Sequence, residues 1–152
     1  MYSCEFSWEL NLPVGDDIHQ AVVTFLRTSS SGIWQQNTDE KSDALVMHFR
    51  RGDWGKAVFS KKLVPGWPKR PDLCAMTLRV TVRPTPQDMR IGLHFVACLP
   101  SAPTSVVAPI ELRKFNNAIE LHCAREAEDF ANYLHRYYQI ELPPKLSSSP
   151  AR

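Results

Sequence analysis

The sequence predicts an α+β fold: a two-layer sandwich of an antiparallel, mostly meander sheet of about five strands, with a short N-terminal helix and a long C-terminal helix on one face. Three observations lead to this prediction. Several segments alternate apolar and polar residues, turn-forming residues join neighbouring segments, and one long segment near the C-terminus repeats apolar residues at helical spacing. A sheet with one apolar face needs a covering layer, which the two helices supply.

The first strand and the first helix follow from the N-terminal pattern. Residues 2–12 alternate almost without fault, which is typical of a strand with one buried and one exposed face. Pro13 and Gly15 end this strand, and Asp16 and Asp17 can cap a helix. The apolar positions of that helix recur at helical spacing, and they are Ile18, Val22, Phe25 and Leu26. Residues 28–43 are polar, so we expect a long loop there, or a loop with one short helical turn.

The middle of the chain predicts two hairpins. Alternation returns at 45–49, and residues 52–55 form a turn into a strand that carries Ala57 and Phe59. Residues 64–72 contain three prolines, which a central strand cannot hold, so this segment is expected to be a surface loop. Two further alternating segments, 74–83 and 89–99, are joined by a proline-containing turn and make the second hairpin.

The C-terminal helix is predicted from about Glu111 to Tyr138. Its apolar stripe consists of Phe115, Ile119, Cys123, Ala127, Phe130, Leu134 and Tyr137. Pro143 and Pro144 stop it. With 152 residues, 43% of them hydrophobic and 22% charged, the chain has the size and composition of one globular domain. We therefore expect a single domain over 1–142 and a disordered tail, rich in Pro and Ser, over 143–152.

This order of elements, an open curved sheet that holds a long C-terminal helix, is similar in outline to the helix-grip shape of the START and Bet v 1 group. The resemblance covers topology only. The usual form has two short helices after the first strand and six strands before the last helix, whereas this sequence predicts one helix and four strands. The chain is therefore not assigned to that group.

The charge is unevenly distributed along the chain. Residues 1–49 carry a net charge of −5, residues 50–90 carry +7, and residues 91–152 are neutral. Such a basic block can bind phosphate or another anionic surface, although the solvated outer face of a sheet gives the same count. Arg79 and Arg83 should lie on that outer face, near Glu5 and Glu9 if the first strand lies close to theirs.

Other sequence features concern the compartment. The four cysteines show no CxxC pair and no zinc-type spacing, so we interpret them as reduced thiols, with one disulfide as the alternative; they are Cys4, Cys74, Cys98 and Cys123. Glu5 and Glu9 interrupt what would be the apolar region of a signal peptide. No apolar stretch approaches the roughly 18–20 residues that span a membrane. We expect a cytoplasmic protein.

Catalytic and metal-binding motifs are weak. His122 and Glu126 lie four residues apart on the predicted helix, the spacing of two metal ligands, but no third ligand follows from the pattern. An ordinary hydrogen bond between them is the favoured interpretation. There is no nucleophile motif and no phosphate-binding glycine loop. We expect no cofactor, no metal and no catalysis, and His122 and Glu126 are the pair we would nominate if the chain were an enzyme.

The leading functional hypothesis is a non-catalytic binding or interaction domain with a basic, tryptophan-containing surface at 50–70. This surface would meet a protein or an anionic partner, and its residues are Arg50, Arg51, Trp54, Lys61, Lys62, Trp67, Lys69 and Arg70. The outward positions of the clearest strands carry no aromatic pair, which argues against nucleic acid. The oligomeric state does not follow from the sequence.

The alternative hypothesis is a small hydrophobic-ligand carrier, with a cavity between the sheet and the C-terminal helix. The small residues Cys123 and Ala127 in the middle of the helical stripe could leave a void there. The residues that would line it are Trp8, Phe95, Cys123, Ala127, Phe130 and Tyr137.

Overall fold

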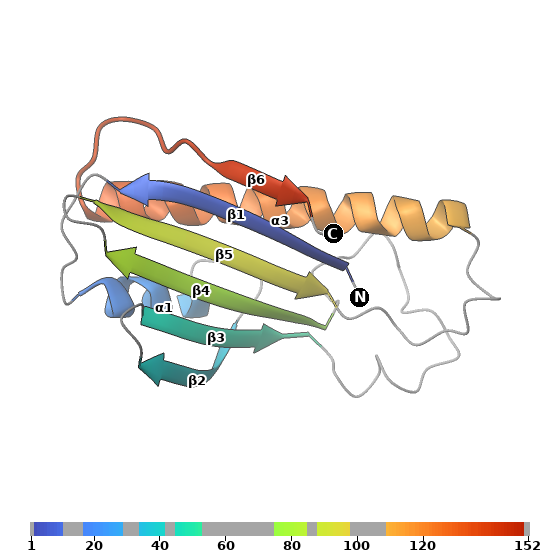
Figure 1. The fold of residues 1–152 in the computed structure, drawn as a ribbon, viewed down its shortest axis with the longest axis horizontal. Helices are drawn as coiled ribbons and strands as arrows, with labels where there is room; N and C mark the ends of the chain where they lie inside the picture. The colour runs from blue at the N-terminus through green and yellow to red at the C-terminus, as the bar shows by residue number, and fades with distance from the viewer. Residues whose placement is uncertain are drawn as a thin grey trace.

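The computed structural model confirms the predicted α+β class. It describes residues 2–10, 17–28, 34–41, 45–52, 75–84, 88–97 and 109–150. In chain order the elements are β1 (Tyr2–Leu10), α1 (Ile18–Thr28), β2 (Gln35–Lys41), β3 (Leu45–Arg51), β4 (Met76–Pro84), β5 (Met89–Ala97), α3 (Pro109–Tyr137) and β6 (Ser147–Pro150). The two helices lie on the same side of the sheet (Figure 1).

The six strands form one sheet in the order β2-β3-β4-β5-β1-β6, and each neighbouring pair is antiparallel. Strands β2 to β5 follow one another as a meander. The first strand then lies beside β5, with Phe6 opposite Leu93, and β6 closes the other edge of β1. An antiparallel meander is confirmed, but the predicted pairing of 45–49 with a strand at Ala57 and Phe59 is wrong, because β2 and β4 occupy the two sides of β3.

The core lies between the sheet and the helices. Strand residues of one parity are buried, as the alternation predicts; in β4 and β5 they are Met76, Leu78, Val80, Val82, Met89, Ile91, Leu93, Phe95 and Ala97. From α3, Ile119, Phe130 and Leu134 are buried against them. The ring of Phe130 lies 5.7 Å from that of Trp8, edge to face. The side chain of Phe115 lies outside the described residues.

Two strands differ from the sequence-based expectation. Gln35–Lys41 forms β2, where a loop was expected, and it pairs with β3 at the edge of the sheet. Ser147–Pro150 forms β6 inside the segment expected to be a disordered tail. Both strands are polar and both lie at edges, where backbone hydrogen bonds hold a strand without an apolar face. Hydrophobic alternation cannot detect strands of this kind.

Some expectations fall on residues that the structure does not describe. They include the turn at 53–55, the strand that would carry Ala57 and Phe59, and the proline-rich loop at 64–72. Of the helices in the described ranges, neither is both long enough and apolar enough to cross a membrane.

Candidate functional site

Besides a row formed by Arg50, Thr77, Val96 and Ser3, the face of the sheet turned away from the helices carries three further rows of side chains. The register places these rows directly across neighbouring strands. One row contains His48, Arg79, His94, Glu5 and Ser149; the middle row contains Val46, Thr81, Gly92, Ser7 and Ser147; the third contains Arg83, Arg90 and Glu9. The sequence predicted the outward direction of Arg79 and Arg83, and both are exposed.

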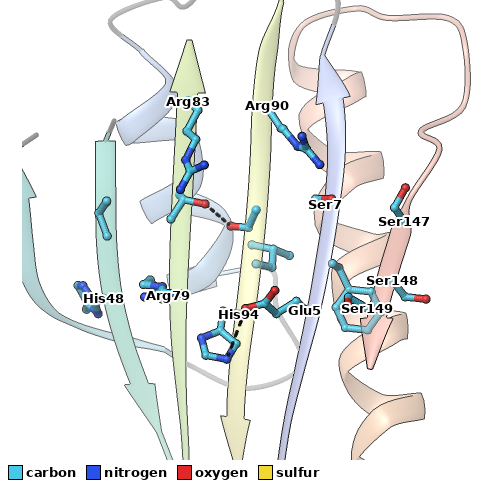
Figure 2. Close-up of a pocket in the computed structure, with 15 residues that line it drawn as sticks. Glu5, Ser7, His48, Arg79, Arg83, Arg90, His94, Ser147, Ser148 and Ser149 are labelled. Carbon is cyan, nitrogen blue, oxygen red and sulfur yellow. Dashed lines mark hydrogen bonds and ion pairs between the residues drawn. The ribbon is translucent and has the colours of Figure 1, made fainter. Parts of the chain in front are cut away.

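The middle row forms the floor of a hollow of about 770 Å³. Gly92 leaves space in this row that a side chain would fill. A Cβ atom at this position would collide with Thr81, since it would lie 2.6 Å from Oγ1. The hydroxyl of Thr81 instead donates to the carbonyl oxygen of Gly92 at 3.5 Å. Ser7 and Ser147 continue the floor towards the β6 edge (Figure 2).

One end of the hollow, which we call the paired-arginine end, consists of Arg83 and Arg90. The two residues are directly opposite each other on β4 and β5, and both are exposed. Like charges at facing positions destabilise a sheet. Glu9 lies opposite Arg90 on β1, yet within the described part of the chain no carboxylate oxygen is within 4.0 Å of either guanidinium. This end therefore presents two arginine charges that form no ion pair with a described carboxylate.

The other end, which we call the histidine end, groups His48, Arg79, His94 and Glu5 (Figure 2). Nε2 of His94 lies 3.8 Å from Oε1 of Glu5. Burial lowers the pKa of His94 below its usual value of 6.5, Arg79 lowers it further, and Glu5 opposes both. His94 is thus mainly neutral at pH 7. Among the described residues, the lining of this hollow contains three arginines and one glutamate.

A second hollow, of about 650 Å³, lies between β1, the C-terminal part of α3 and the chain that leads to β6. Arg90 and Ser147 line both hollows. Nδ1 of His135 is 2.7 Å from the carbonyl oxygen of Leu142, which ties this connecting segment to the helix.

His122 and Glu126, nominated from the sequence, belong to a buried polar cluster on the opposite side of the sheet. Oε2 of Glu126 is 2.9 Å from Nη1 of Arg51 and 3.6 Å from Nε2 of His122. Trp34 donates its indole N–H to Oε1 of Glu126 at 2.6 Å, and the Arg51 guanidinium lies 4.3 Å from the centre of the Trp34 ring. Nη2 of Arg51 is 2.7 Å from Nε2 of His122; because a guanidinium only donates, this nitrogen accepts.

The assignment of Arg51 to an exposed partner surface is corrected. Its side chain is 2% exposed and lies on the core side of β3. The signal was present in the sequence, since Arg51 shares the parity of the buried Met47 and Phe49. Trp34 is also part of this cluster, although it lies in the segment expected to be a loop. The available clue was that Trp34 and its neighbour Ile33 are the large apolar residues of an otherwise polar stretch.

The remaining predicted site residues divide into two groups. Arg50 is exposed on β3, whereas Trp54, Lys61, Lys62, Trp67, Lys69 and Arg70 lie outside the described residues, so the 50–70 surface stays a prediction. Of the predicted cavity lining, Tyr137 is 43% exposed and does not face the interior, which corrects that expectation. The other members, Trp8, Phe95, Cys123, Ala127 and Phe130, are buried in the core.

In the described ranges, no group of three or more His, Cys, Asp or Glu side chains is placed to hold a metal ion. No protein-family model matches the chain, and no curated protein matches it significantly.

Proposed function

We propose that this chain is a non-catalytic binding domain and that the hollow on the open face of its sheet binds an anionic ligand of the phosphate class. The observation that carries the proposal is the paired-arginine end. Arg83 and Arg90 face each other across two strands with no carboxylate within ion-pairing distance in the described residues. A bound anion would accept hydrogen bonds from both guanidinium groups and remove their mutual repulsion.

The side chains around the arginines suit a phosphate group. A guanidinium offers planar, paired donors that match two oxygens of a phosphate or carboxylate. The hydroxyls of Ser7 and Ser147 add further donors to the same hollow. The outward positions of β1, β3, β4 and β5 hold no Phe, Tyr or Trp, so stacking of nucleobases finds no platform among the described residues.

The hollow also fits the basic block of the sequence. Arg79, Arg83 and Arg90 all belong to residues 50–90, and Arg50 points to the same side of β3 as His48. The proposed ligand is the anionic partner that the sequence led us to expect, at a position on the sheet rather than in the loops.

The alternative function, a hydrophobic-ligand carrier, rests on the space between the sheet and α3. Trp8 and Phe25 each pack on the ring of Phe130, at 5.7 and 5.0 Å between centroids, and Phe95 packs on Trp34 at 6.2 Å. These contacts occupy the middle of that space. Of the two hollows lined by described residues, the larger lies on the opposite face of the sheet, which favours the open face as the candidate.

The test is an NMR titration of the protein with inorganic phosphate at constant ionic strength. Phosphate should shift the backbone amide signals of Thr81, Gly92 and Ser7, and the variants Arg83→Gln and Arg90→Gln should weaken binding by about tenfold each. Arg136→Gln removes the same charge from the exposed face of α3 and serves as the matched control. Equal binding by all four proteins, or no saturable shift in the wild type, would refute the proposal.

A further inference from the structure

We infer that the ligand carries two anionic groups joined by a hydroxylated spacer, as a sugar bisphosphate does, and that it bridges the two ends of the hollow. This inference rests on the proposed function and names its ligand class. One phosphoryl group would lie at the paired-arginine end and the other at Arg79, with the spacer over Gly92.

The two ends of the hollow are too far apart for one phosphate group to contact both. Arg79 and Arg83 are four residues apart on the same face of β4, which corresponds to about 13 Å along the strand. Arg90 and His94 have the same spacing on β5. Each end contains at least one exposed arginine that can donate to a phosphoryl group; at the histidine end this is Arg79, with Glu5 as the neighbouring acidic group. A single phosphate is too small to contact both ends at once, whereas a ligand with two phosphoryl groups can.

The floor between the two ends is lined by hydroxyl groups that suit a hydroxylated spacer. Gly92 has no side chain, and the neighbouring floor positions hold the hydroxyls of Thr81 and Ser7. A hydroxyl both donates and accepts hydrogen bonds, so this floor matches the hydroxyls of a sugar or polyol. An apolar spacer would make no hydrogen bond with the hydroxyl of Ser7.

The shape of the surface favours a small molecule over an acidic peptide. A peptide that binds a sheet usually adds a strand to a free edge. In this sheet the edges are β2 and β6, whereas the three arginines lie on the face of β4 and β5, around a hollow of about 770 Å³. That volume falls in the range of about 300–1,000 Å³ that is typical of small-molecule sites.

Calorimetric titrations at constant ionic strength test the inference with four probes: a hexose 1,6-bisphosphate, the matching 6-monophosphate, inorganic phosphate and a short polyglutamate peptide. We expect the bisphosphate to bind at least about tenfold more tightly than the 6-monophosphate and than inorganic phosphate. Arg79→Gln should weaken the bisphosphate by about tenfold and leave inorganic phosphate unchanged, whereas Arg83→Gln should weaken both. Arg136→Gln is again the control, and thermal melts verify that each variant is folded.

The possible results separate this inference from the proposed function. Equal affinity for the bisphosphate and the monophosphate overturns the two-group ligand and leaves the anion site in place. Binding of polyglutamate alone overturns the small-molecule ligand and identifies an acidic protein as the partner. If none of the four probes binds, both proposals are wrong. A second variant, Gly92→Ala, fills the floor without changing charge, and it should weaken the bisphosphate more than inorganic phosphate.

Discussion

Removal of the Glu126 carboxylate should destabilise the protein by about 3–5 kcal/mol, because it leaves the Arg51 charge buried without a counterion. Oε1 of Glu126 accepts from Nη1 of Arg51 at 3.0 Å and from the indole N–H of Trp34 at 2.6 Å, and Oε2 forms an ion pair with the same Arg51 nitrogen at 2.9 Å. The side chains of Arg51 and Glu126 are 2% and 3% exposed, so water cannot replace these contacts. In Glu126→Ala, Arg51 would lose its counterion and Trp34 its acceptor.

Two further variants separate the charge from the contact. Glu126→Gln keeps an oxygen that can accept from Trp34, so it should cost less than Glu126→Ala. The double variant Arg51→Met/Glu126→Leu removes both charges together, and it should recover most of the loss. Nε of Arg51 has no hydrogen-bond partner within the described residues, so its removal also relieves a buried donor.

Urea denaturation followed by circular dichroism measures the free energy of unfolding of each variant. Glu128→Ala, on the exposed side of the same helix, is the matched control and should change stability by less than about 0.5 kcal/mol. A loss of under about 1 kcal/mol in Glu126→Ala would refute the reasoning. So would a double variant whose loss of stability equals the sum of the losses in the single variants Arg51→Met and Glu126→Leu. The first result would mean that water reaches the cluster, and the second that the pair has no coupling.

Three other predictions concern the core, the histidine end and the thiols. Phe130→Ala should lower the free energy of unfolding by about 3–5 kcal/mol in the same urea assay, since the ring packs against Trp8 and Phe25; a loss under about 1 kcal/mol would contradict this packing. An NMR titration of His94 should give a midpoint below pH 6.5, because burial and Arg79 lower the pKa of its imidazole more than Glu5 raises it. The free energy of unfolding should fall as the pH drops from 6.5 towards that midpoint, because the unfolded chain takes up the proton first. A midpoint above 6.5 would mean that Glu5 outweighs burial and Arg79. Cys123 should resist alkylation at pH 8 in the native protein and react in urea, because a hydrogen bond with Cys4 and burial raise the pKa of its thiol. Mass spectrometry of the digested protein measures the labelling. Fast labelling of Cys123 in the native protein would contradict this prediction, because it would show that the thiol is accessible.

The strands that the sequence predicts well are those with one buried face. In β1, β4 and β5 the alternation of apolar residues matches the burial along nearly the whole strand. β2 and β6 lack this signal, since their pairing depends on backbone hydrogen bonds to β3 and β1. Arg51 was misplaced because its charge was given more weight than its parity on β3.

The candidate site was predictable only in its parts. Alternation predicts that Arg79 and Arg83 point outward, but not which residues face them. The position of Arg90 opposite Arg83 depends on the register of the β4–β5 hairpin, and Gly92 meets Ser7 only through the pairing of β5 with the distant β1. Long-range pairing of this kind leaves no local pattern in the sequence.

The place of β1 in the sheet has a consequence for the order in which the chain can fold. β1 is synthesised first, but its neighbours are β5 and β6, so it has no strand partner until residues 89–97 have been added. Phe6, Trp8 and Leu10 lack their sheet neighbours during that interval, and unpaired apolar strands are prone to aggregate. Pairing across such long stretches of chain also makes folding slow, because the loop must close before any contact forms. A fragment that ends before β5 would therefore leave its N-terminal strand unpaired.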